Sequence, residues 1–135
     1  MKIPILFTGK YEHLYPYKHT YWVRKYCQNE IVHRDNDKPA IIVFSLFTNK
    51  SWELRKYWYK DGLLHRDNGP AIEAVNSLGN FEYQYYQNGK KHREDGPAHI
   101  ESGYGRHYYQ DGIKINEEVF LLRKIWKKMN ENKHL

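Results

Sequence analysis

The sequence lacks the cysteine pairs and the long apolar segments that exported, membrane-spanning and zinc-binding proteins usually contain. Cys27 is its only cysteine, so the chain can form no internal disulfide and has no cysteine pair for a structural zinc site. Near the N-terminus, a short apolar run is broken by Pro4 and followed by no small-residue cleavage site, and no later stretch reaches the roughly 18 apolar residues of a membrane span. We therefore expect a cytoplasmic protein in a reducing environment.

Long aliphatic runs are also scarce, whereas aromatic residues are abundant. Aromatic side chains make up 16% of the 135 residues, and the mean hydropathy is −0.94. Tyr and Trp bury a ring while a polar group stays in water, which favours a sheet over a helical bundle. The length is that of one domain, residues 1–135, and the net charge of +6 favours polyanions or acidic protein surfaces as partners.

A short motif recurs along the chain. It reads HRDNDKPA at 33–40, HRDNGPA at 65–71 and HREDGPA at 92–98. His-Arg-Asp also begins the catalytic loop of protein kinases, but a catalytic base is needed once, and the chain has no glycine-rich phosphate loop. Recurrence in register instead indicates a structural element.

Alignment on this motif divides the middle of the chain into four units, which begin at Tyr26, Trp58, Tyr85 and Tyr108. The last unit lacks the His-Arg pair. Three units contain Asp-Gly or Asn-Gly, at 61–62, 88–89 and 111–112. Two-residue hairpin turns prefer these dipeptides because both turn residues need a positive φ. Each unit is therefore expected to bend at this dipeptide.

The spacing between units shortens in even steps. From the last Ala of one motif to the first aromatic residue of the next unit, the chain advances 18, 14 and then 10 residues, over 40–58, 71–85 and 98–108. A loss of four residues removes two from each strand of a hairpin and keeps every side chain on its face of the sheet. We predict a mainly β fold of antiparallel, stacked and tapered β-hairpins, with loops near 48–51, 76–80 and 103–105.

The C-terminal segment predicts a helix over 116–133. Asn116 is a good N-cap, and two acidic residues follow in the first turn. One face is apolar and is expected to dock on the last hairpin as a cap; it consists of Val119, Leu122, Ile125, Trp126 and Met129. The other face is basic and is either a solvated surface or a contact for acidic groups. Residues 14–22 resemble either an N-terminal cap or an incomplete first hairpin. We assign the cap to 1–20 and the hairpin repeats to 21–115.

The recurring triplet predicts a polar staple between neighbouring hairpins. We expect each Arg to bond an acid or carbonyl of a neighbouring hairpin and each His to hold a turn carbonyl. The residues of this structural motif are His33, Arg34, His65, Arg66, Gly69, His92, Arg93 and Gly96. The three His would bind a metal only if their rings converged, which an extended array disfavours. The sequence therefore predicts no catalytic residue, metal site or cofactor.

The string YYQNGKKHREDGPA resembles the degenerate MORN-like repeats found in proteins of large DNA viruses, phages and bacteria, and more distantly the repeats of YwqK-type antitoxins. The resemblance covers about residues 21–118. It departs from the usual pattern in having Arg and an acid where Gly normally follows the His, and in its unequal spacing. The resemblance implies a β-hairpin scaffold for protein contacts, in some members near membranes, without catalytic residues.

Two classes of function fit these observations. The preferred one is a non-enzymatic protein-binding module, interpreted as a viral or phage protein that inhibits a host factor such as a defence nuclease. The alternative is a protein that binds single-stranded RNA by tyrosine stacking and basic residues. In both cases no membrane partner is expected, and a homodimer could form through sheet edges. Candidate partner-binding residues are Tyr83, Tyr85, Arg106, His107, Tyr108, Arg123, Lys124, Lys127 and Lys128.

Overall fold

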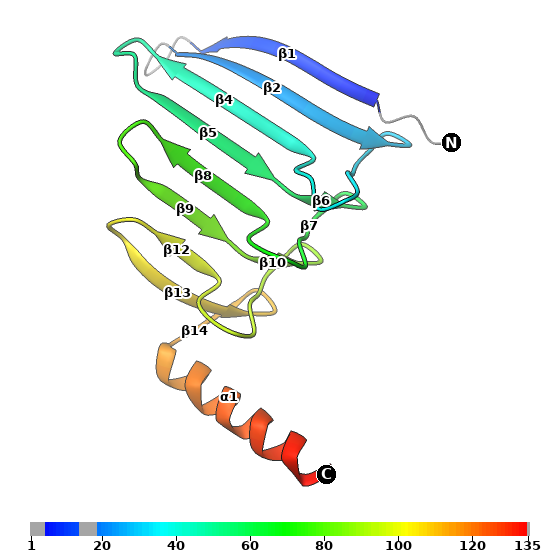
Figure 1. The fold of residues 1–135 in the computed structure, drawn as a ribbon, viewed down its shortest axis with the longest axis vertical. Helices are drawn as coiled ribbons and strands as arrows, with labels where there is room; N and C mark the ends of the chain where they lie inside the picture. Colours follow the sequence, from blue (N-terminus) through cyan, green and yellow to red (C-terminus); the bar gives the residue numbers. More distant parts are fainter. Residues whose placement is uncertain (1–4, 14–18, 135) are drawn as a thin grey trace.

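The protein, described here by a computed structural model for residues 5–13 and 19–134, is a single large antiparallel sheet followed by a helix (Figure 1). The large sheet has ten strands within the described residues, and nine of them, each of three or more residues, lie side by side in chain order and are called the long strands. They are β1 (Ile5–His13), β2 (His19–Gln28), β4 (Ile41–Phe47), β5 (Trp52–Tyr57), β8 (Ile72–Asn76), β9 (Phe81–Gln84), β12 (His99–Glu101), β13 (Gly105–Gln110) and β14 (Ile113–Ile115). The predicted mainly β, antiparallel fold with a C-terminal helix is confirmed.

Short two-residue strands flank the long ones along one side of the sheet (Figure 1). They are β3 (Ile31–Val32), which pairs with the end of β2, and the pairs β6 (Tyr59–Lys60) with β7 (Leu63–Leu64) and β10 (Tyr86–Gln87) with β11 (Lys90–Lys91). Their turns have positive φ at both central residues, for example 49° at Asn88 and 79° at Gly89. The predicted tight turns at the Asp-Gly and Asn-Gly dipeptides are thus confirmed.

The long strands turn at the expected places, at 48–50, 77–79 and 102–104. The paired segment of successive long hairpins shortens from six residue pairs in β4–β5 to four in β8–β9 and three in β12–β13. At the N-terminus, β1 pairs with β2 over nine residue pairs. The strand β1 therefore lies within the expected N-terminal cap of 1–20, while residues 14–18 of the predicted incomplete hairpin lie outside the described residues.

Each histidine of the motif joins its own unit to the turn of the next one. The Nδ1 atom of His33 accepts a hydrogen bond from the backbone N–H of Asp61 at 3.0 Å. His65 and His92 accept from Asn88 and Asp111 at 3.1 and 3.0 Å. The imidazole thus holds a turn N–H and not the predicted turn carbonyl, because the left-handed turn directs its first N–H towards the preceding unit.

Each arginine of the motif mainly organises its own unit. The Arg66 guanidinium lies 3.8 Å from the centre of the Trp58 ring, and it donates to the Pro70 carbonyl at 3.1 Å. Arg34 and Arg93 make the equivalent ring and proline contacts. Among the contacts between described residues, only Arg66 of the three also reaches an acid of the preceding unit, donating to both carboxylate oxygens of Asp37 at 2.8 and 3.1 Å. The prediction of an arginine staple between hairpins is therefore wrong for the other two.

The most deeply buried residues are small. Ala40, Ala71 and Ala98, which end the three motifs, have no exposed surface. Their carbonyls accept hydrogen bonds from the aromatic residue that begins the same unit, at 2.8 Å in each case. Because these alanines are completely enclosed, a larger side chain would have to displace its neighbours, which favours Ala at the end of each motif.

The helix α1 (Glu117–Glu131) begins as predicted, because the Asn116 side chain accepts a hydrogen bond from the N–H of Val119. Its docking was predicted wrongly. Phe120, which is 3% exposed and lies 4.7 Å from the Tyr108 ring, is its one buried residue. The predicted docking face is solvent-exposed from Leu122 to Met129, and the helix runs away from the sheet towards the C-terminus (Figure 1).

Polar contacts explain this orientation of the helix. Arg123 donates to the Gln110 side chain at 2.7 Å, and Lys127 pairs with Glu94 of the last motif. These contacts draw the basic face towards the strands and leave the apolar face outside. Within the described residues, no helix combines the length and apolar character needed to cross a bilayer.

Replacing Gly89 with Val should destabilise the fold by about 2 kcal/mol, because a β-branched residue is strained at its φ of 79°. The new Cβ would also lie 3.3 Å from Cδ2 of Leu63 in the preceding unit. Urea unfolding followed by circular dichroism measures this loss. Gly89→Asn is the matched control, since Asn tolerates the left-handed region and should retain most of the stability. Equal stability of the Val variant would contradict the turn assignment.

Stability should also depend on pH through the Asp37–Arg66 pair. The hydrogen bonds from Arg66 hold the pKa of the Asp37 carboxyl below its ordinary value of 3.8. The pair therefore stabilises the fold above that value, and this contribution is lost as the pH falls through the lower folded-state pKa. We expect Asp37→Asn to lower the melting temperature at pH 7 and to leave a shallower decline below about pH 4. Glu118→Gln, on the exposed helix surface, should change neither.

Candidate functional site

The candidate partner-binding residues do not form one surface. Tyr83 and Arg106 lie on one face of the sheet, separated by Ile100, which pairs with both, whereas His107 belongs to the opposite face through its pairing with His99. The ring of Tyr85 is covered by the Arg93 guanidinium, 3.9 Å from the ring centre.

Residues near and on the helix make intramolecular contacts. The Tyr108 hydroxyl donates to Glu117 at 2.7 Å, and that hydrogen bond raises the Tyr108 pKa above its ordinary value. Arg123 and Lys127 are engaged with Gln110 and Glu94, as described above. The remaining two candidates, Lys124 and Lys128, are exposed on the helix. Part of the basic face of the helix therefore holds the helix against the last two units.

One face of the sheet carries an unbroken apolar row across five strands. Residues directly opposite each other on neighbouring antiparallel strands point to the same side. The register of β2, β4, β5, β8 and β9 places in line Trp22, Phe44, Leu54, Val75 and Phe81. Leu46, Trp52 and Tyr83 lie in adjacent rows of the same face. These eight residues together are termed the aromatic face.

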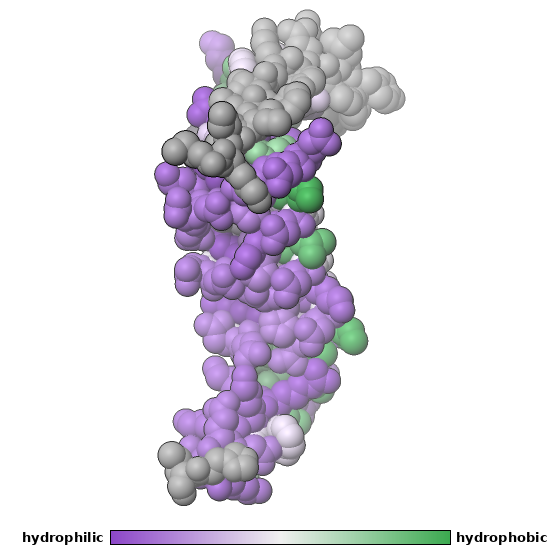
Figure 2. All heavy atoms as spheres, turned by 90° about the vertical axis from the view of Figure 1, so that its right-hand side faces the viewer, coloured by the Kyte–Doolittle hydropathy of each residue, from purple (hydrophilic) through white to green (hydrophobic). Residues whose placement is uncertain are grey.

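The aromatic face is exposed to solvent. Seven of its eight side chains, all except Leu54, have exposed fractions between 36% and 39%. The rings contact one another, with centroid distances of 5.7 Å for Trp22–Phe44 and 5.1 Å for Phe81–Tyr83. Viewed from the side of the short hairpins, the molecule is hydrophilic over most of the visible surface, with hydrophobic residues gathered along one side (Figure 2). Contact between the rings limits their freedom before any partner binds.

The charges on this face are mainly positive. The row next to the apolar one contains Arg24, Lys56 and Arg106 together with Glu73, according to the strand register. The Glu73 carboxylate is already engaged by Arg66, at 2.7 Å. Among the side chains that the structure describes on β2 to β13, the aromatic face therefore presents apolar rings beside three cationic groups and one carboxylate.

A groove of about 620 Å³ lies elsewhere, between the second and third motifs, and is lined by Arg66, Asp67, Gly69, His92, Arg93 and Asp95 among others. Its charged groups largely satisfy one another. Arg93 donates to Asp95 at 2.7 Å, and this hydrogen bond lowers the pKa of the Asp95 carboxyl. Arg66 is bonded to Asp37 and Glu73. The groove thus offers few unpaired groups to a ligand.

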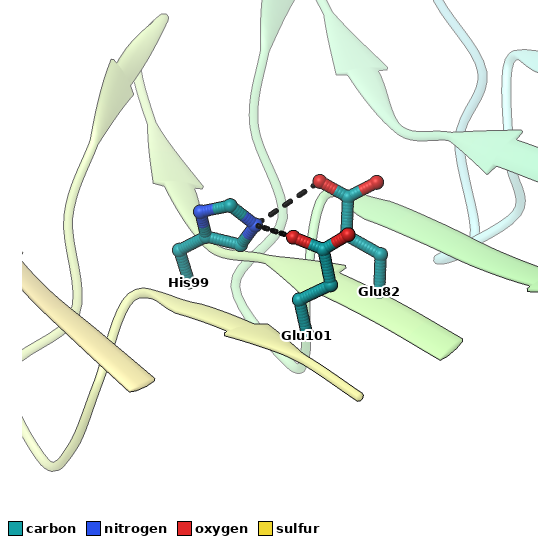
Figure 3. Close-up of side chains that lie close together, drawn as sticks. All are labelled: Glu82, His99 and Glu101. Carbon is teal, nitrogen blue, oxygen red and sulfur yellow. Dashed lines mark hydrogen bonds and ion pairs between the residues drawn. The ribbon is translucent and has the colours of Figure 1, made fainter. Parts of the chain in front are cut away.

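The opposite face of the sheet carries a polar cluster that sequence reasoning missed (Figure 3). Glu82 on β9 and Glu101 on β12 are directly opposite each other, and the His99 ring points towards both carboxylates. Its Nε2 atom lies 3.1 Å from Glu82 and 3.9 Å from Glu101. Burial, followed by the charge of Lys91, lowers the pKa of His99 despite these carboxylates, so the neutral imidazole is favoured at neutral pH.

Arg55 completes this cluster from β5. It pairs with Glu53 of the same strand and reaches Glu82 at 3.7 Å. The hydrogen bond to Glu53 raises the Arg55 pKa above its ordinary value. The alternation of Glu53 and Arg55, and of His99 and Glu101, indicated residues on one side of each strand. Their convergence depends on the register between strands, for which the sequence contains no direct signal.

Comparison with known proteins adds no assignment, since no family model, curated protein or solved structure matches the chain. The resemblance of the motif to MORN-like repeats accordingly stays a prediction.

Proposed function

We propose that the chain is a non-enzymatic hairpin-repeat protein of MORN-like type that binds another protein through the aromatic face. The observation that carries this proposal is the continuous row of large apolar side chains across five strands, with more than one third of most of them exposed. The helix contacts the sheet at β13 and runs away from it, so it does not cover this row (Figure 1). Contiguous exposed apolar surface of this kind is typical of interaction sites.

The composition of the face favours a protein partner. Trp, Tyr and Phe are enriched in the centres of protein interfaces, where they contribute most of the binding energy. Their attachment to hydrogen-bonded strands, and the ring contacts between them, reduce the conformational entropy lost on binding. A face of this kind suits a rigid apolar contact patch on another folded protein.

The charges beside the rings favour an acidic partner. Arg24, Lys56 and Arg106 would meet carboxylates at the edge of the contact and accelerate association. Pairing of two copies through this face would instead bring like charges together, which argues against a face-to-face homodimer. A viral or phage protein that occludes an acidic surface of a host factor, such as a defence nuclease, is the biological setting that this proposal and the sequence analysis favour.

The RNA-binding alternative has weaker support. Exposed stacked rings such as Phe81 and Tyr83 are suited to base stacking, and Arg106 lies on the same face. The lysines expected to contact the RNA backbone are on the helix, however, where Lys127 is paired with Glu94. A stacking platform and a phosphate-binding track are thus not brought together in one groove.

A photo-crosslinking analogue of phenylalanine at position 81 of the full chain tests the proposal. It should capture a specific protein, and calorimetry with that purified protein should show saturable binding. Phe81→Ser should weaken binding by roughly 30-fold, as expected for removal of a central aromatic anchor. The affinity should also fall as salt increases, because the cationic side chains then contribute less.

The matched control is Leu78→Ser. Leu78 is 83% exposed in the turn between β8 and β9, so the substitution removes a similar apolar side chain outside the aromatic face. It should leave binding unchanged. Equal binding by the Phe81→Ser variant and the wild-type chain would contradict the proposal. Sub-micromolar binding of a labelled single-stranded RNA that is weakened by Phe81→Ser, and by Glu at 124, 127 and 128, would assign the face to RNA instead.

A further inference from the structure

We propose that Glu82, His99 and Glu101 bind a divalent transition-metal ion, with Zn²⁺ the best fit, on the face of the sheet opposite the aromatic face. Each residue supplies one ligand atom, and all three atoms lie within 4.8 Å of one another. This inference is independent of the proposed protein-binding function, because the two sets of residues occupy opposite sides of the strands.

The distances between the ligand atoms are close to those around a bound zinc ion. Tetrahedral zinc with ligand bonds of about 2.0–2.1 Å places its ligand atoms about 3.3 Å apart. The Nε2 atom of His99 is 3.1 Å from Oε1 of Glu82 and 3.9 Å from Oε2 of Glu101. The three side chains converge on one point from two adjacent strands (Figure 3). Small side-chain rotations would therefore complete the geometry.

Charge gives a second reason to expect a cation. Glu82 and Glu101 face each other directly across β9 and β12, a placement that destabilises a sheet when both are ionised. The positive groups nearby are Arg55, whose closer carboxylate partner is Glu53, and Lys91, whose ammonium lies over the Tyr109 ring at 4.9 Å. Three carboxylates and two cations leave the region net negative. A divalent ion between the facing carboxylates would relieve their repulsion.

The surroundings position the ligands and leave room for a further one. Arg55 approaches Oε2 of Glu82, whereas Oε1 faces His99 and also accepts from the Gln84 side chain. Such outer contacts orient a carboxylate for metal binding. The side chains are partly covered, with 18% exposure for both Glu82 and His99. Beside Glu82 and Glu101 opens a polar pocket of about 290 Å³ from which a water molecule could supply the remaining ligand.

The ligand set discriminates between metals. One imidazole nitrogen with two carboxylate oxygens suits zinc and similar transition metals, whereas Mg²⁺ and Ca²⁺ prefer oxygen ligands alone. Bound metal would link β9 to β12 and so join two successive long hairpins. A structural role of this kind would raise the melting temperature, since the ion binds the folded chain and not the separated strands.

Calorimetric titration of the untagged, chelator-treated full chain with zinc chloride tests the site. We expect one Zn²⁺ per chain, a higher melting temperature with zinc, and little binding of Mg²⁺. His99→Gln and Glu101→Gln should each weaken zinc binding at least 10-fold. Circular dichroism of each variant checks that the sheet is retained, and Co²⁺ in place of zinc reports nitrogen and oxygen ligands through its visible spectrum.

Two matched controls locate the ion. His107→Gln removes the neighbouring imidazole, whose ring centroid is 5.8 Å from that of His99, and Glu118→Gln removes an exposed helix carboxylate. Both should bind zinc as the wild type does. The proposal is wrong if the wild-type chain shows no saturable zinc binding, if folded His99→Gln and Glu101→Gln bind normally, or if His107→Gln loses as much affinity as His99→Gln.

Discussion

The fold depends on the hydrogen bond between a motif histidine and the first N–H of the following turn. A left-handed two-residue turn leaves this N–H pointing out of its own hairpin, towards the preceding unit, where a side-chain acceptor can bind it. The imidazole of the preceding unit accepts it at 3.0–3.1 Å in all three cases. With Nδ1 acting as an acceptor, the neutral ring has its proton on Nε2, where His33 and His65 meet Asp35 and Asp67. A single histidine side chain thus contacts both the turn of the following unit and an aspartate of its own unit.

The same arrangement explains how a sheet with little core can be ordered. Its fully buried residues are alanines, and no large side chain is completely buried among the described residues. Stability must come from strand pairing, from guanidinium groups packed on rings and from contacts between units. The side chain at the sixth position of one unit, such as Leu63, packs on the turn glycine of the next. Contacts between successive hairpins thus take the place of a central hydrophobic core.

Local features of this fold were predictable from the sequence, and features that depend on distant contacts were not. The Asn-Gly and Asp-Gly turns and the Asn116 cap follow from local backbone chemistry and are confirmed. The helix was predicted to bury its apolar face, but contacts of Arg123 with the fourth unit and of Lys127 with the third unit orient it the other way. The aromatic face and the Glu82–His99–Glu101 cluster depend on cross-strand register. Alternation along each strand indicated the faces, but not which residues would meet.

The histidine contact also gives the array a direction. Each of the first three units offers an acceptor to the unit that follows it, and each following turn offers the donor. In the fourth unit Ile115 occupies the histidine position, so this unit receives a contact and passes none on. A chain of identical units could be extended by another copy at either end, whereas here the fourth unit lacks both the His-Arg pair and the Gly-Pro-Ala turn and continues into α1. The number of units is thereby encoded in the sequence itself.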